Sequence, residues 1–332
     1  MNKKYSELAE LFRSEKTDEE ILDFLLNYHK NDIADMMAGM TEEERKRLYH
    51  LLGAQKVAEI FKYIEEPRKY IRELSVESAA RVISEMDSDD AVDLLEDLDP
   101  EEKEQIVRML DEDAKKDVKM LLSYDEEEIG SCMTTNYICI PENLTIRQAM
   151  SELVKQAGEN DNIMTIYVVD EKGVFAGAID LKDLIRAREN AHLEDLVLKS
   201  YPYVTDHEKI DDCMDRILDY AEDSIPVLSE DKKILGVITS EDLIEMVDNE
   251  MGEDYAKLAG LTAEEDLKEP TLQSMKKRLP WLIILLFLGM AVSSVVGLFE
   301  NVVAVLPIVI CFQSLVLDMA GNVGTQSLAV TI

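Results

Sequence analysis

The sequence has few basic residues, few cysteines and no recognisable catalytic motif. Its 332 residues include 35 Lys and Arg against 70 Asp and Glu, which gives a formal net charge of −35. No nucleic-acid partner is expected, because binding phosphate backbones needs a basic surface. The four cysteines form no CxxC pair, so neither a zinc site nor a disulfide framework is indicated. No P-loop, paired nucleophile and base, or metal-hydrolase spacing is present, which argues against an enzyme.

Charge is almost missing from the end of the chain. Residues 279–332 contain only Glu300 and Asp318 as charged side chains. The apolar run 280–299 has about the length that a helix needs to cross a hydrocarbon core of ~30 Å, and it is too far from the N-terminus to be a signal peptide. Basic residues at 276–278 precede it, so the positive-inside rule places everything N-terminal in the cytoplasm. The sequence predicts two transmembrane helices in a cell membrane.

The second of these helices carries unusual residues for a membrane segment. An acid such as Asp318 is costly in lipid and usually marks an ion path or a contact between helices. Gly321 and Gly324 flank Asn322, and such glycines are expected to loosen the helix and free backbone carbonyls that suit hard cations such as Mg²⁺. The alternative is that they only allow close helix packing. We expect Asp318 and Asn322 to face a cation path.

Residues 1–125 have the pattern of consecutive short helices. Apolar positions recur at helical spacing, and acids follow residues that suit helix N-caps. Thr41 with Glu44 predicts a capping box, and Asp87 and Asp99 precede two further helices. This pattern favours either a superhelix of helical hairpins or a plain acidic helical bundle.

The next region, residues 126–247, contains an internal repeat. Residues 166–185 align without gaps on residues 225–244, an offset of 59 positions. Each copy is typical of a strand, a polar turn, a second strand and a helix that begins near Asp180 or Thr239, and another strand and helix precede each copy. This α/β repeat resembles a tandem pair of CBS domains.

The resemblance to CBS domains implies a nucleotide site. In the second copy, Thr239 could hold phosphate and Asp242 could accept from ribose hydroxyls of ATP or another adenine nucleotide. The first copy has Asp180 in place of the threonine, and a carboxylate there would repel phosphate, so at most one site is expected. The alternative is that Thr239 and Asp242 only cap a helix.

The motif Gly-Asn-x-Gly-x-Gln-Ser at 321–327, together with Phe299-Glu300 at the end of the preceding helix, resembles the MgtE family of magnesium transporters. The resemblance implies a multidomain membrane protein that works as a homodimer. Its parts would be an acidic α-helical superhelix (1–125), the CBS pair (126–247), a long connecting helix that plugs the pore mouth (248–279) and an all-α transmembrane part (280–332). Family members have five membrane helices. The last three are not in this sequence, so we expect a fragment or a truncated product.

The same resemblance implies regulatory Mg²⁺ ions that join the N domain, the CBS pair and the connecting helix, and that close the pore when cytosolic Mg²⁺ is plentiful. Asp89 and Asp93 stand four residues apart, where like charges on one helix face repel unless a divalent ion binds them. The implied ligands are Glu59, Asp89, Asp90 and Asp93 in the N domain, Asp231, the Ile238 carbonyl and Glu241 in the second CBS copy, and Glu264 and Glu265 in the connecting helix.

Two functions are therefore expected from the sequence. The first is a Mg²⁺-gated magnesium channel or transporter subunit, with Mg²⁺ both regulating and transported. The second is a membrane-tethered sensor of the CBS type that binds divalent ions or nucleotide and transports nothing.

Overall fold

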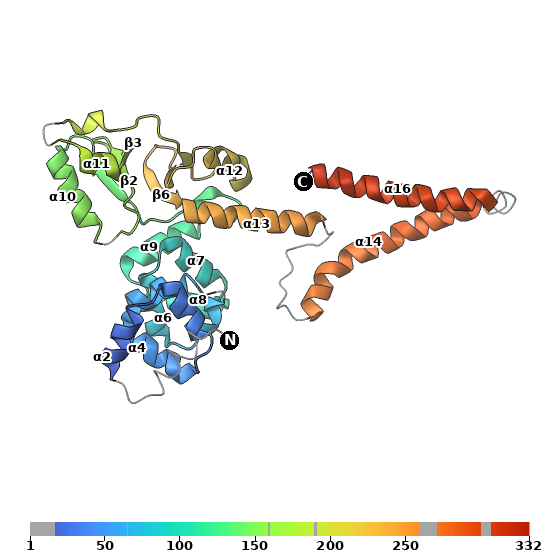
Figure 1. Cartoon of the computed structure of the whole chain (residues 1–332), viewed down its shortest axis with the longest axis horizontal. Coiled ribbons are helices and arrows are strands. Elements are labelled where there is room, and N and C mark those ends of the chain that lie inside the picture. Colours follow the sequence, from blue (N-terminus) through green and yellow to red (C-terminus); the bar gives the residue numbers. More distant parts are fainter. Residues whose placement is uncertain are drawn as a thin grey trace. The chain divides into compact units, whose positions relative to one another are not determined.

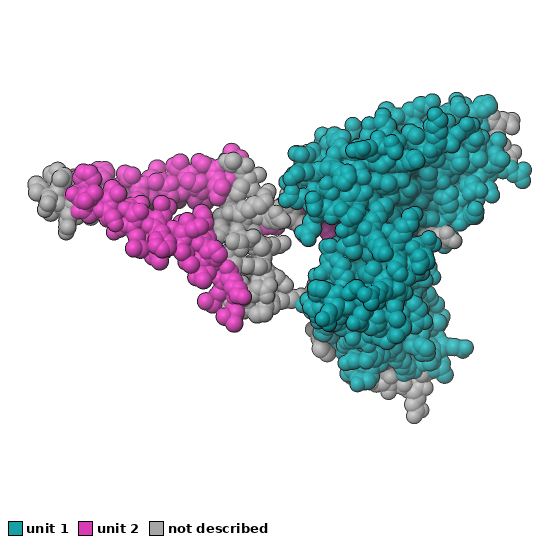
Figure 2. All heavy atoms as spheres, turned by 180° about the vertical axis from the view of Figure 1, so that it is seen from behind, with its two compact units in different colours: residues 1–242 teal, residues 243–332 magenta. Residues whose placement is uncertain are grey.

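The computed structural model describes residues 17–64, 66–158, 160–188, 191–258, 271–299 and 307–331. Two compact units result, residues 1–242 and residues 243–332, which Figure 2 colours teal and magenta. Within the first unit, an all-helical N domain is followed by an α/β part that contains both repeat copies (Figure 1). We describe each unit by itself.

The N domain consists of short helices, as the sequence predicts. They are α2 (Asp18–Leu25), α3 (Lys30–Met37), α4 (Glu42–Phe61), α5 (Pro67–Ile71), α6 (Val76–Ser84), α7 (Ser88–Glu96), α8 (Pro100–Met109) and α9 (Glu112–Leu121). Helix α4 packs against α6, α6 against α8, and α7 against α9, which is the alternation that stacked helical hairpins produce. Their buried faces are apolar, and Ile21, Leu48, Ile83 and Leu95 have no exposed surface.

Helix starts follow the predicted caps in part. The Thr41 amide donates to the Glu44 carboxylate at 2.8 Å, which confirms the predicted capping box of α4. Asp87 and Asp99 occupy the N-cap positions of α7 and α8, but neither side chain caps its own helix. Both carboxylates instead accept bonds from distant residues, so the sequence predicts these helix starts but not what the two acids do.

The α/β part has two three-stranded sheets of the same topology. In each sheet the first strand pairs parallel with the second and the second pairs antiparallel with the third. After the short turn η1 (Ile129–Cys132), the first copy comprises β1 (Ile138–Pro141), α10 (Ile146–Gln156), β2 (Thr165–Val169), β3 (Phe175–Asp180) and α11 (Leu181–Arg186). After η2 (Leu193–Asp195), the second comprises β4 (Val204–Thr205), α12 (Ile210–Leu218), β5 (Ser224–Leu228), β6 (Ile234–Thr239) and the start of α13 (Ser240–Leu258).

The sequence repeat is confirmed down to single residues. Val168 pairs with Gly177 in the first sheet and Val227 pairs with Gly236 in the second, with a register shift directly after each valine. At each glycine, the lack of a side chain lets the backbone of another segment lie directly against the sheet. A Cβ on Gly177 would lie 2.5 Å from the Leu198 carbonyl oxygen, and one on Gly236 would lie 2.7 Å from that of Thr134. The two copies therefore form one packed pair, as the sequence predicts.

The second unit contains α13 from Leu243 onward and the helices α14 (Thr271–Leu298) and α16 (Pro307–Thr331). Among the described residues, one segment, Arg278–Leu298, is long and apolar enough to cross a membrane. Helix α16 runs without a break through Gly321 and Gly324, so the expected loosening at these glycines is wrong. Glycine costs a helix only about 1 kcal/mol relative to alanine, and no proline follows in the helix to disrupt its bonds.

Candidate functional site

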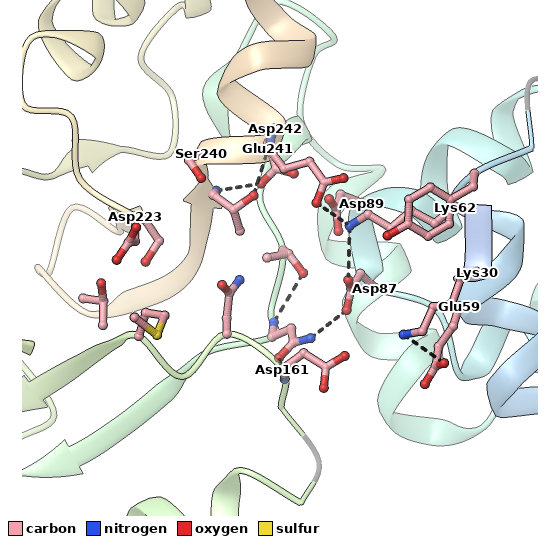
Figure 3. A pocket seen from close by; sticks show the side chains of 18 residues that line it. Lys30, Glu59, Lys62, Asp87, Asp89, Asp161, Asp223, Ser240, Glu241 and Asp242 are labelled. Carbon is pink, nitrogen blue, oxygen red and sulfur yellow. Dashed lines mark hydrogen bonds and ion pairs between the residues drawn. The ribbon is translucent and has the colours of Figure 1, made fainter. Parts of the chain in front are cut away.

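A cavity of about 350 Å³ lies where the N domain meets the second repeat copy, within residues 1–242 (Figure 3). Its lining contains seven acids and two bases. The acids are Glu59, Asp87, Asp89, Asp161, Asp223, Glu241 and Asp242, and the bases are Lys30 and Lys62. The cavity therefore attracts cations.

On the N-domain side, Glu59 comes from α4, and the other acids lie at the start of α7. Its first turn carries Asp89 and Asp90, where carboxylates interact favourably with the positive end of the helix dipole. Asp87, at the N-cap, accepts a hydrogen bond from the Asn136 side-chain amide at 2.7 Å, and the Ser88 hydroxyl accepts from the Thr135 amide at 2.9 Å. These bonds hold the start of α7 against the segment that leads into the first repeat copy.

On the opposite side, the start of α13 supplies two acids, Glu241 and Asp242. The Thr239 amide donates to the Asp242 carboxylate at 2.7 Å, and the Asp242 amide donates to the Thr239 hydroxyl at 3.3 Å. Such a reciprocal pair is the arrangement of a capping box. Both residues therefore cap α13. Capping is the second of the two roles that the sequence allows them, beside holding a nucleotide.

Lys62, the C-cap residue of α4, lies among these acids. Its Nζ atom is 3.2 Å from the Glu241 carboxylate and 3.9 Å from each of the Asp87 and Asp90 carboxylates. The other lysine of the cavity, Lys30, pairs with Glu59 at 2.9 Å. Figure 3 shows the Lys62 ammonium between side chains from both domains.

Three acids in or beside the cavity, Asp89, Asp90 and Asp242, have raised pKa values. Burial, followed by the charges of Asp242, Asp90 and Asp87, raises the pKa of Asp89 well above its ordinary value. Burial likewise raises the pKa of Asp90, to about 7, although Lys62 opposes the shift. Burial also raises the pKa of Asp242. Burial disfavours the charge of Lys62, but Asp90 and Glu241 more than compensate and raise its pKa.

This chemistry fits a hard divalent cation. The Oδ1 atom of Asp89 is closed to solvent and has no hydrogen-bond partner, so one buried acceptor is available to an ion. Among the described residues, no three Asp, Glu, His or Cys side chains already converge as in a formed metal centre. Mg²⁺ prefers oxygen ligands and keeps several of its waters, so it can bind acids spread around a cavity of this kind.

The structure brings some of the predicted ligands together and leaves others apart. Glu59, Asp89 and Glu241 line the cavity, and Asp90 contacts Lys62 beside it. Asp93 is exposed on the same helix, Asp231 is exposed in the turn between β5 and β6, at the far end of β6 from Thr239, and Ile238 is buried within β6. Glu264 and Glu265 lie outside the described residues, and the predicted pore residues Asp318 and Asn322 lie on α16.

Several residues of the cavity were not predicted as cation ligands. Asp87, Asp161 and Asp223 had no distinguishing signal in so acidic a sequence, and Asp242 was assigned to a nucleotide instead. Lys62 was missed because its contact with Glu241 joins residues that are distant in the chain. No local pattern reveals such a contact.

Comparisons with known proteins agree with this architecture. The family model of the MgtE intracellular N domain matches residues 28–127, and the CBS domain model matches residues 127–190 and 193–249. A magnesium transporter MgtE of Enterococcus faecalis is 39% identical over the whole chain, which covers 74% of that relative. The chain belongs to the MgtE family of magnesium transporters.

Solved structures agree with the family assignment. The soluble part of a magnesium transporter superposes with a TM-score of 0.71 at 30% identity, covering 74% of this chain and 98% of that one. The cytosolic domain of the Mg²⁺ channel MgtE in complex with ATP gives a TM-score of 0.65 at 26% identity, covering 73% and 99%. These relatives are magnesium transporters.

Proposed function

We propose that this MgtE chain carries the cytosolic Mg²⁺ sensor and the first membrane-spanning part of a Mg²⁺-gated magnesium channel or transporter. The observation that supports this most is that acids of α7, in the N domain, and acids at the start of α13, in the second CBS copy, line one cavity. A divalent ion in that cavity would be attracted by both domains at once and would hold them together.

The gating mechanism is electrostatic. When cytosolic Mg²⁺ is scarce, carboxylates on the two sides repel each other and the domains separate; when it is plentiful, the bound ion replaces repulsion with attraction. Glu241 and Asp242 belong to the first turn of α13, and this helix continues along the chain toward the apolar segment Arg278–Leu298. Ion binding at the cavity would therefore act on the first turn of α13, the helix that precedes α14 in the chain.

Transport itself requires the membrane part. Asp318 and Asn322 stand four residues apart on α16 and so share one helix face, which we assign to the ion path. The chain covers 74% of the length of the Enterococcus faecalis relative. We infer a homodimer in the cell membrane with its N-terminal domains in the cytoplasm. Family membership favours this function over the tethered sensor.

An adenine nucleotide is a second proposed ligand, because a solved MgtE cytosolic domain contains ATP. The cavity itself disfavours phosphate, since acids outnumber lysines there and Thr239 and Asp242 bond to each other's amides. We therefore expect ATP to bind elsewhere on the CBS pair. Equilibrium dialysis with radiolabelled ATP tests this expectation, and an Asp242→Ala variant should bind ATP as the original protein does. Loss of ATP binding in this variant would place the nucleotide in the cavity instead.

The sensor proposal predicts local protection by Mg²⁺. In hydrogen exchange of the whole chain in detergent micelles, millimolar Mg²⁺ is expected to slow amide exchange in α7 and at the start of α13, because the ion holds these two segments together. Strands β2 and β3 of the first sheet serve as internal controls and should exchange at the same rate with and without the ion. Equal ionic strength is kept with KCl. Exchange in α7 that does not respond to Mg²⁺ contradicts the proposal.

A further inference from the structure

Lys62 is the basic side chain that the structure places against the acids of both domains. It reaches Glu241 of α13 at 3.2 Å and Asp87 and Asp90 at 3.9 Å, whereas Lys30 is paired with Glu59. Its side chain retains 28% of its exposure, so it reaches the acids from the rim of the cavity. One ammonium group thus already bridges the two surfaces that a divalent ion would join.

The position of Lys62 suits a permanent cation. As the C-cap residue of α4 it stands at the negative end of a helix, where a positive charge is favoured. An ammonium is a compact point charge with three donors, so it can contact several carboxylates at once. Because Lys62 is tethered, it competes for these carboxylates at a high effective concentration that does not vary with the ions of the cytosol.

We propose that Lys62 is a built-in competitor of the divalent ion and sets the Mg²⁺ concentration at which the cavity fills. This inference rests on the proposed sensor function. In the ion-free protein, the ammonium takes part of the ion's role by linking α7 to α13. To bind Glu241, Asp87 and Asp90, Mg²⁺ must displace the ammonium, so a higher Mg²⁺ concentration is needed than the acids alone would require.

The test measures the Mg²⁺ concentration at which half of the slowing of amide exchange in α7 is reached, using the whole chain. This concentration is called the midpoint. Lys62→Met keeps the aliphatic stem and removes the charge, and we expect its midpoint to fall about tenfold, the size of effect that one charge at this range produces. In the absence of divalent ions the same variant should exchange faster in α7 than the original protein, because the bridge to α13 is lost. A purely structural role for Lys62 would not give these two opposite changes.

Two matched variants make the outcome decisive. Lys62→Arg keeps the charge and Lys56→Met removes a charge from the same helix outside the cavity lining, and both midpoints should stay within about twofold of the original. An unchanged midpoint in Lys62→Met, or an equal fall in Lys56→Met, overturns the inference. If Lys62→Met does not protect β2 and β3 normally, Lys62→Gln takes its place. An original protein without any Mg²⁺ response instead contradicts the sensor function.

Discussion

Replacing Asp89 by asparagine is expected to stabilise the ion-free protein and to abolish its stabilisation by Mg²⁺. Asp89 has a carboxylate oxygen that is closed to solvent and unpaired, and Asp87, Asp90 and Asp242 lie close enough to raise its pKa further. A buried carboxylate oxygen without a hydrogen-bond partner costs on the order of 1–3 kcal/mol, and the neutral amide carries a smaller cost. The same substitution removes the negative charge and replaces one carboxylate oxygen by an amide nitrogen, so an ion gains less on binding.

Calorimetric unfolding of the whole chain, with and without Mg²⁺, measures both effects of Asp89→Asn. For the original protein, Mg²⁺ at about 100 times its dissociation constant should add about 2.7 kcal/mol of stability, whereas the variant should gain little. Asp219→Asn, at an exposed site outside the cavity, removes the same charge and should keep the response. A variant that Mg²⁺ still stabilises fully would show that Asp89 does not contact the ion.

The pH dependence identifies the cause of the gain in Asp89→Asn. Because the pKa of Asp89 is raised in the folded protein, its cost is absent at pH values below its unfolded pKa and grows as the pH rises toward the folded value. The advantage of the variant should therefore be larger at about pH 8 than at about pH 5. An advantage that does not vary with pH would point to altered packing rather than to charge.

Much of the fold could be predicted from local patterns. The capping box of Thr41 and Glu44 and the repeat offset both correspond to real features, because helix caps and strand alternation are set by neighbours in the chain. Asp87 shows the limit of this reasoning. It stands where a cap is expected, yet it accepts a bond from Asn136 in another domain, which depends on how the domains pack.

The candidate site could be predicted only in part. Resemblance to a family identified acids of α7 and Glu241, but it gave no place to Lys62, whose partners lie in different segments of the chain. The motif of Thr239 and Asp242 is shared by nucleotide sites and helix caps, and in the structure both residues cap α13. Charge identities are visible in a sequence, whereas which charges meet is decided by tertiary packing.

Replacing Arg45 by methionine is expected to be the most destabilising change in the N domain. The Arg45 and Glu73 side chains are only 9% and 10% exposed, and the Arg45 guanidinium donates to the Glu73 carboxylate and to the Met37 and Met40 carbonyls. Its loss leaves a buried carboxylate and the Met40 carbonyl without their donor, whereas the Met37 carbonyl keeps the Met40 amide. Breaking such a buried pair costs about 3–5 kcal/mol. The melting temperature should fall by on the order of 10 °C.

Two further variants distinguish the loss of a buried ion pair from the loss of a surface charge in α4. Lys46, the residue after Arg45, pairs with Glu42 on α4. Both side chains are about half exposed, so Lys46→Met should cost less than about 1 kcal/mol. The double variant Arg45→Met with Glu73→Leu removes both charges and should recover much of the loss, because an apolar pair leaves no carboxylate unpaired. Equal melting temperatures for Arg45→Met and Lys46→Met would show that the pair does not hold α3, α4 and the segment after α5 together.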